Sequence, residues 1–214
     1  MRSIKMLGLA AIAAMAVMAF VGASSASATI ICKEDNTGVC AKPMTETSSV
    51  EGTASGPFLE VSATEKITCK SSKLTTKVTT AGAGSEGNTT WSECSNTVSG
   101  CSGSATTVNT AANRTGSVSW TEAHKFSVVT NNPETTVKMT CFGIPVSCTY
   151  KPATITGAGT NATSEAGKAT IVINEKIASP GFPCPAGTEH ATYTVTNPSN
   201  KLAGHVGQFD VAKE

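Results

Sequence analysis

Hydrophobic and polar residues alternate with a period of two along much of this chain. In the segment 135–141, Val137, Met139 and Cys141 share one face, and the residues between them are mostly polar. The segment 190–196 alternates in the same way. Successive side chains of a β-strand point to opposite faces, so this pattern predicts half-buried strands. Further strands are expected at 58–62, 65–70, 74–79, 104–110, 116–121, 124–130, 146–150, 168–174 and 206–211.

Turn-rich stretches separate these predicted strands. They are residues 81–88, 131–133, 157–167 and 179–187. No long amphipathic helical pattern is present, and the abundant threonine and valine suit a pleated, half-buried surface. Many short strands between turn signals are typical of sandwiches and barrels. Because each apolar sheet face needs a cover, we expect an all-β, disulfide-stapled, two-layer β-sandwich, with immunoglobulin-like and jelly-roll topologies both open.

The N-terminus has the pattern of a secretory signal peptide. Arg2 and Lys5 precede an uncharged apolar run over residues 6–22. Ala26 and Ala28 then supply the small side chains that signal peptidase requires, which predicts cleavage after Ala28. No second long apolar run follows. We therefore expect a secreted protein, extracellular or at the cell surface, whose mature chain has no membrane span.

The predicted signal peptide, 1–28, is followed by two regions. Residues 29–57 are expected to form an exposed N-terminal segment with a short cysteine loop, because 41–57 lacks periodicity, and residues 58–214 are expected to form one β-sandwich domain. Cleavage removes two of the 16 basic residues and leaves 14 against 15 acidic ones. This balance gives no reason to expect nucleic acid as a partner. Extracellular glycan or the cell envelope is the partner class that we consider.

All eight cysteines follow the predicted cleavage site: Cys32, Cys40, Cys69, Cys94, Cys101, Cys141, Cys148 and Cys184. An even number of cysteines in an exported chain predicts disulfides, and the spacings do not suit a zinc site. The separations favour three local loops and one long-range link: Cys32–Cys40, Cys94–Cys101, Cys141–Cys148 and Cys69–Cys184. Cys69–Cys94 together with Cys101–Cys184 fits the spacing nearly as well, so both pairings remain open.

Residues that could carry catalysis are few. The three histidines, His124, His190 and His205, are not accompanied by a G-x-S-x-G or H-E-x-x-H motif. We interpret His190 and His205 as structural. Asp35 and Asp210 are the two aspartates that could orient a catalytic histidine. No catalytic, cofactor-binding or metal-ligating residue and no cofactor is predicted.

Two weaker signals concern ligands. Residues 34–38 combine acidic side chains with a turn glycine, as in calcium loops, but their spacing differs from an EF-hand and favours a solvated turn. Trp91 and Trp120 could stack on a sugar if they were exposed. We expect both to pack in the core, Trp120 more clearly because it alternates with Val118.

The signal sequence, Ile31-Cys32-Lys33, the short cysteine loops and the segment 193–196 together resemble a group of small secreted actinobacterial proteins, known as an uncharacterised hypothetical-protein family. The resemblance spans most of the chain. It implies an extracellular β protein and supplies no functional residues.

Two classes of function follow from these features. We expect a secreted, non-catalytic β-sandwich that acts in adhesion, at the cell surface or as a ligand-binding module. The alternative is a secreted carbohydrate-active enzyme or carbohydrate-binding module. A groove lined by two glutamates and an exposed tryptophan would favour the alternative.

Overall fold

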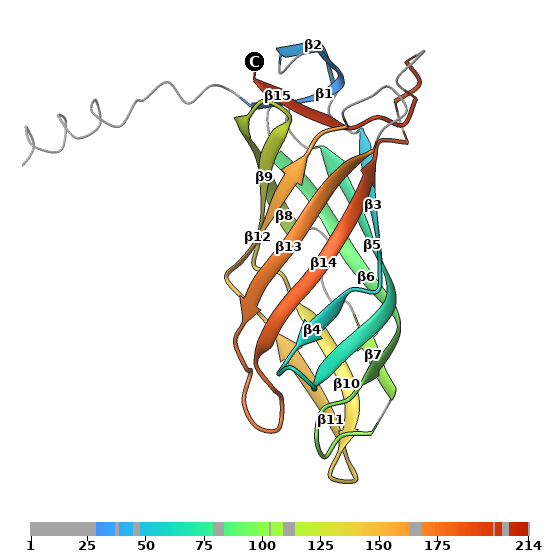
Figure 1. The fold of residues 1–214 in the computed structure, drawn as a ribbon, viewed down its shortest axis with the longest axis vertical. Helices are drawn as coiled ribbons and strands as arrows, with labels where there is room; N and C mark the ends of the chain where they lie inside the picture. The colour runs from blue at the N-terminus through green and yellow to red at the C-terminus, as the bar shows by residue number, and fades with distance from the viewer. Residues whose placement is uncertain are drawn as a thin grey trace, which may run out of the picture.

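The computed structural model describes residues 29–36, 39–44, 48–78, 84–102, 104–108, 114–162, 168–198, 200–202 and 206–213. Within these residues the chain forms fifteen β-strands and no helix, which confirms the all-β class (Figure 1). The strands are β1 (Thr29–Asn36), β2 (Val39–Pro43), β3 (Ser49–Ser55), β4 (Phe58–Glu60), β5 (Lys66–Val78), β6 (Gly84–Asn96), β7 (Ser104–Val108), β8 (Arg114–Glu122), β9 (Lys125–Asn131), β10 (Thr135–Cys141), β11 (Ile144–Tyr150), β12 (Thr154–Thr160), β13 (Ala169–Ile177), β14 (Gly187–Thr196) and β15 (Asp210–Lys213). The described part of the chain holds no helix of the length and apolarity that a membrane span requires. The predicted signal peptide lies outside the described residues.

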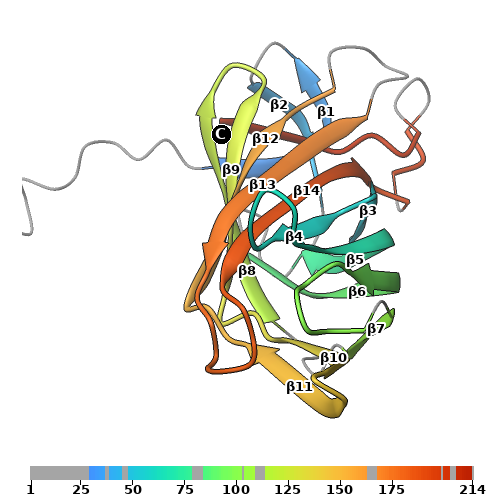
Figure 2. The same ribbon diagram turned by 60° about the horizontal axis from the view of Figure 1, so that its bottom comes forward.

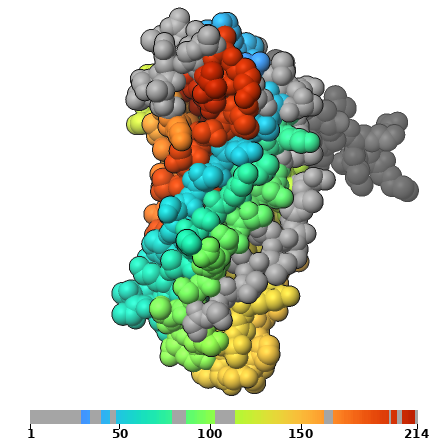
Figure 3. All heavy atoms as spheres, turned by 90° about the vertical axis from the view of Figure 1, so that its right-hand side faces the viewer, coloured from blue at the N-terminus to red at the C-terminus, as the bar shows by residue number. Residues whose placement is uncertain are grey.

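Eight of the described strands close into an antiparallel barrel. Around the barrel the order is β3, β5, β6, β8, β9, β12, β13 and β14, and β14 pairs with β3 to close the ring (Figure 2). Strand β4 continues the position of β3, since it pairs with the same neighbours, β5 and β14. The strands cross the face in Figure 3 obliquely, as the closure of a sheet requires. Because sequence neighbours are also sheet neighbours, the topology is up-and-down.

The expected two-layer sandwich is therefore replaced by one sheet that curls onto itself. Immunoglobulin-like and jelly-roll topologies need connections that pass between sheets, whereas the strand order here runs along the chain. Alternation along a strand shows only that one face is buried. It does not distinguish a face covered by a second sheet from a face covered by the far side of the same sheet.

Three segments expected outside strands belong to the barrel. The end of the expected turn 81–88 lies in β6, which begins at Gly84. Residues 49–55, placed by the sequence in an exposed lead-in, form β3 and bury Val50 and Ala54. The glycine-rich start of 157–167, expected as a turn, lies in β12. A Cβ at Gly159 would lie 2.0 Å from Cε2 of Phe126, which occupies the opposite position on β9. Glycine at this position therefore makes room for a buried aromatic ring.

A small sheet of β1, β2 and β15 covers one end of the barrel (Figure 1). Ile31 and Phe209 are buried there, and Phe209 meets the ring of Phe126 edge-on at 5.9 Å. The buried Asn161 side chain holds the C-terminal strand: its Nδ2 donates to the Val211 carbonyl at 2.7 Å, and its Oδ1 accepts from the Val211 N–H at 2.9 Å. One amide thus satisfies both backbone groups of a residue in the covering sheet.

The opposite end carries the β10–β11 hairpin and β7 (Figure 1). All eight cysteines lie within the described residues and are paired, as predicted. The four disulfides are Cys32–Cys40, Cys69–Cys94, Cys101–Cys141 and Cys148–Cys184. Cys32–Cys40 is confirmed. Of the alternative pairing, Cys69–Cys94 is confirmed and Cys101–Cys184 is wrong.

The predicted pairs Cys94–Cys101, Cys141–Cys148 and Cys69–Cys184 are wrong because the turns fall elsewhere. Cys141 lies opposite Ile144 in the hairpin, so only two residues form its turn. Cys148 lies opposite Val137, which is four positions before Cys141 on β10. Four strand residues span about 13 Å, well beyond the reach of a disulfide. Cys94 likewise lies opposite Ala105, four positions after Cys101.

Candidate binding cavity inside the barrel

Inward-facing side chains leave the barrel incompletely filled. A cavity of about 160 Å³ lies inside it, and Ile31 and Phe209 close the cavity toward the covering sheet. Its walls are mainly aliphatic and aromatic and include Val50, Leu74, Val118, Val128, Ile171, Ile173 and Tyr193. Closed barrels of this strand number have interiors just wide enough to be filled by side chains or to hold one small ligand. A cavity of this volume places the barrel in the second category.

A smaller cavity of about 70 Å³ adjoins the first. Both cavities are lined by Trp91, Pro133, Thr135, Ile155 and Glu189, so these five residues lie at their junction. The smaller cavity extends toward the disulfide-linked end, where Cys69 and Val137 line it. We call the larger space the upper cavity and the smaller space the lower cavity.

Glu189 is the acidic side chain at the junction of the two cavities. It shares the inward face of β14 with Ala191 and Tyr193, which are buried. Glu189 is half-buried, and both cavities touch it, so the surface it exposes faces the interior. Burial, together with the smaller effect of the Glu175 charge, raises the pKa of the Glu189 carboxyl to about 7. Glu175 lies directly opposite Glu189 in the β13–β14 ladder.

The two tyrosine hydroxyls near the cavities have hydrogen-bond partners. The hydroxyls of Ser72 and Tyr193 hydrogen bond at 2.9 Å, and the Tyr150 hydroxyl donates to the Pro185 carbonyl at 3.0 Å. Burial raises the pKa of Tyr150 to about 12 and also raises that of Tyr193. In the described part of the chain, no side chain donates a hydrogen bond to the Glu189 carboxyl, and only a second acid acts on it electrostatically. Among the described residues, Glu189 is therefore an interior acid with no cationic partner.

Arg114 and Glu134 also line the upper cavity. Arg114 Nη2 lies 3.1 Å from Glu134 Oε2, and Lys151 Nζ lies 3.3 Å from the same oxygen. The negative charge of Glu134 is thus already matched by cations. Among the described residues, Glu189 has no such cationic partner, although both acids line the upper cavity.

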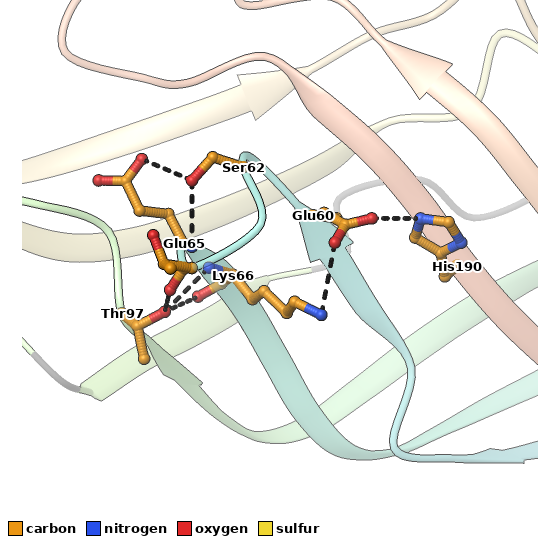
Figure 4. Close-up of polar contacts among 7 residues, drawn as sticks. Glu60, Ser62, Glu65, Lys66, Thr97 and His190 are labelled. Atoms are coloured by element: carbon orange, nitrogen blue, oxygen red, sulfur yellow. Dashed lines mark hydrogen bonds and ion pairs between the residues drawn. The ribbon is translucent and has the colours of Figure 1, made fainter.

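His190 lies on the outer face of β14 with Glu60 and Phe58. Its Nε2 is 3.2 Å from Glu60 Oε2 (Figure 4). Its ring also stacks on Phe58, with ring centroids 4.7 Å apart. Glu60 also contacts Lys66 at 3.4 Å. The nearby Ser62 hydroxyl hydrogen bonds to Glu65, and no contact joins it to His190 (Figure 4). These contacts hold β4 against β14. Among the described residues, no serine hydroxyl hydrogen bonds to His190, so the histidine has no serine nucleophile beside it.

The remaining sequence candidates are scattered. His124 adopts a left-handed conformation, with φ of 60°, in the β8–β9 turn, and Asp210 is buried in the covering sheet. His205 lies outside the described residues, as does part of the 34–38 segment. Trp120 packs against the core, as expected. Among the described residues, no group of three or more His, Cys, Asp or Glu side chains could hold a metal ion.

Of the two residues that matter most at the junction, sequence reasoning named Trp91 and missed Glu189. Trp91 lines both cavities and also packs against the disulfide-linked core. Glu189 was passed over, although it continues the apolar face of Ala191 and Tyr193 by one step toward the N-terminus. A charged residue on the apolar face of an alternating segment is the signal that could have found it.

No protein-family model, curated protein or solved structure matches this chain.

Proposed function

We propose that this protein is a secreted, disulfide-linked β-barrel that binds one small, largely apolar molecule in its interior. The observation that carries the proposal is the cavity of about 160 Å³ walled by aliphatic and aromatic side chains. The signal-peptide pattern and the pairing of all eight cysteines support an oxidising, extracellular location. The barrel thus replaces the sandwich as the scaffold of the ligand-binding module.

The size of the cavity limits the ligand. An apolar cavity of about 150 Å³ is known to stay dry and to bind benzene. The upper cavity, at about 160 Å³, should therefore accept one six-membered ring. The lower cavity adds about 70 Å³, enough for a short substituent.

A sugar ligand is the second candidate, because Glu134, Glu189 and Trp91 line the same space. Two observations count against it. Arg114 and Lys151 already neutralise Glu134, and the walls are mainly apolar, formed by aliphatic and aromatic side chains. Sugar hydroxyls buried against such walls would lose hydrogen bonds to water without replacement, at a cost of about 1–3 kcal/mol each.

Calorimetric titration of the oxidised mature protein with benzene, toluene and indole tests the proposal. We expect a Kd of about 1 mM or tighter, since −4.1 kcal/mol spread over six carbon atoms is well within the limit for very small ligands. A monosaccharide panel under the same conditions should show no heat. Saccharide binding without aromatic binding would instead favour the second candidate.

The control uses two neighbouring residues on opposite faces of β13. Ile173→Phe places extra volume in the upper cavity and should abolish binding, because Ile173 lines it. Val172→Phe adds the same type of side chain on the outer face, where Val172 is exposed, and should leave binding unchanged. Equal binding by both variants would place the ligand outside the barrel and refute the proposal.

A further inference from the structure

We propose that the ligand is a monocation: its apolar body fills the upper cavity and its ammonium group lies beside the Glu189 carboxylate at the junction of the two cavities. This inference rests on the proposed function and narrows it to a substrate class, small aralkylamines or alkylamines.

The position of Glu189 favours a ligand with one polar end. Glu189 lines both cavities, whereas most aliphatic wall residues line only the upper one. A ligand ring in the upper cavity can therefore direct a substituent toward the junction. Trp91 lines the junction too, and the face of a tryptophan ring is the best aromatic partner for a cation. An acid beside an aromatic ring, with apolar space adjoining, suits an ammonium group that carries an apolar body.

The charges around Glu189 indicate a missing cation. Glu175 faces it from β13, and its carboxylate accepts a hydrogen bond from Thr156 at 2.5 Å. Tyr193 lies on the same face of β14, and Tyr150 lines the lower cavity from β11; both are phenols whose hydroxyls are already hydrogen bonded.

Among the described residues that line the two cavities, the one cation is Arg114, and it is paired with Glu134. Glu189 thus lies at the junction without a basic partner among the described residues, and the opposing Glu175 on β13 adds negative charge to it. A bound ammonium ion would supply that partner.

Binding should depend on pH. An ammonium ion pairs with the ionised carboxylate, and the pKa of Glu189 is about 7 in the empty barrel. Roughly a tenth of the molecules carry the charge at pH 6 and roughly nine tenths at pH 8. The affinity for an amine should therefore rise roughly tenfold over this interval, because an alkylammonium group stays protonated throughout, as lysine does. A neutral ligand of the same shape should not show this rise.

Calorimetry with three matched probes tests the inference. The probes are 2-phenylethylammonium, the neutral 2-phenylethanol and the anionic phenylacetate. At pH 8 we expect the amine to bind at least about tenfold more tightly than the alcohol, as a charge-assisted contact allows, and phenylacetate to bind least. Glu189→Gln should remove the preference for the amine while binding of the alcohol remains. Glu51→Gln, on the barrel strand β3 with its carboxylate paired to Lys73, is the matched control and should keep the preference.

The outcomes separate this inference from the proposed function. If the alcohol binds as tightly as the amine at pH 8, the cation preference is wrong and the apolar cavity stands. If none of the probes binds, both proposals fail. Glu175→Gln provides a second test that keeps Glu189 in place: it should shift the midpoint of the amine pH profile to lower pH. An unchanged midpoint would show that the two acids do not interact and would overturn the inference.

Discussion

The buried acid should make the stability of the empty barrel fall as the pH rises. Burial and Glu175 raise the pKa of Glu189 from an ordinary value of 4.5 to about 7 in the folded protein. The folded state therefore keeps this proton up to a higher pH than the unfolded state does. Between these two pKa values the unfolded state binds fewer protons, so the free energy of unfolding decreases with pH.

The difference between the two pKa values sets the size of the effect. At 1.36 kcal/mol for each unit of pKa, it corresponds to about 3 kcal/mol at full extent. This contribution is fully present below about pH 4.5 and is lost above about pH 7. Glu189→Gln cannot ionise, so its stability relative to the wild type should improve by about 3 kcal/mol between pH 4.5 and pH 8.

Urea unfolding of the oxidised protein, followed by tryptophan fluorescence at pH 4.5, 6, 7 and 8, measures this difference. Glu51→Gln, which removes an outward-facing carboxylate paired with Lys73, serves as the control and should differ from the wild type by a nearly constant amount. The reasoning would be refuted if the difference between Glu189→Gln and the wild type stayed within about 0.5 kcal/mol over this pH range.

Three further predictions concern the scaffold. Gly159→Ala should destabilise the protein by about 1–3 kcal/mol in urea unfolding, because the new methyl group would overlap Phe126, and a cost below about 0.5 kcal/mol would contradict the packing described. Alanine replacement of both Cys148 and Cys184 should cost about 3.8 kcal/mol, against about 2.5 kcal/mol for Cys32 and Cys40, because the sequence separations are 36 and 8. The reverse order of the two costs would contradict the pairing. N-terminal sequencing of secreted protein should begin at Thr29, and a start at Met1 would contradict the cleavage prediction.

Strand locations could largely be predicted from the sequence, whereas strand partners could not. The segments 135–141 and 190–196 alternate clearly, and both lie in strands. Segments with inward glycines were missed, because glycine has no side chain to mark a face: Gly52 lies in β3, and Gly157 and Gly159 lie in β12. In these strands the tight packing of a neighbouring ring or side chain overrides the usual preference of glycine for turns.

The disulfide pairs show the limit of reasoning from spacing. A short separation such as that of Cys141 and Cys148 suggests a closed loop, but a two-residue turn next to Cys141 moves the two thiols apart along the hairpin. Cys69 and Cys94 are 25 positions apart in sequence yet lie directly opposite each other on β5 and β6. Register decides which cysteines meet, and register depends on turn positions that composition alone does not give.

The candidate site could not be predicted from individual strand segments, for a similar reason. A cavity inside a barrel is formed by residues from all around the closed sheet, so no single segment contains it. Glu189 carried a local signal as a charged residue on an apolar face. Its importance becomes clear only when closure brings Trp91 from β6 to the same junction.

Methyl-resolved NMR during a benzene titration tests the central claim most directly, because the same strand provides both the probe and its control. Ile171 and Ile173 line the upper cavity, whereas Val172 between them points outward and is 45% exposed. Benzene should shift the methyl signals of both isoleucines, saturably, and leave those of Val172 unchanged. Shifts at Val172 without shifts at Ile171 and Ile173, or no saturable shifts at all, would show that the barrel interior is not a binding site.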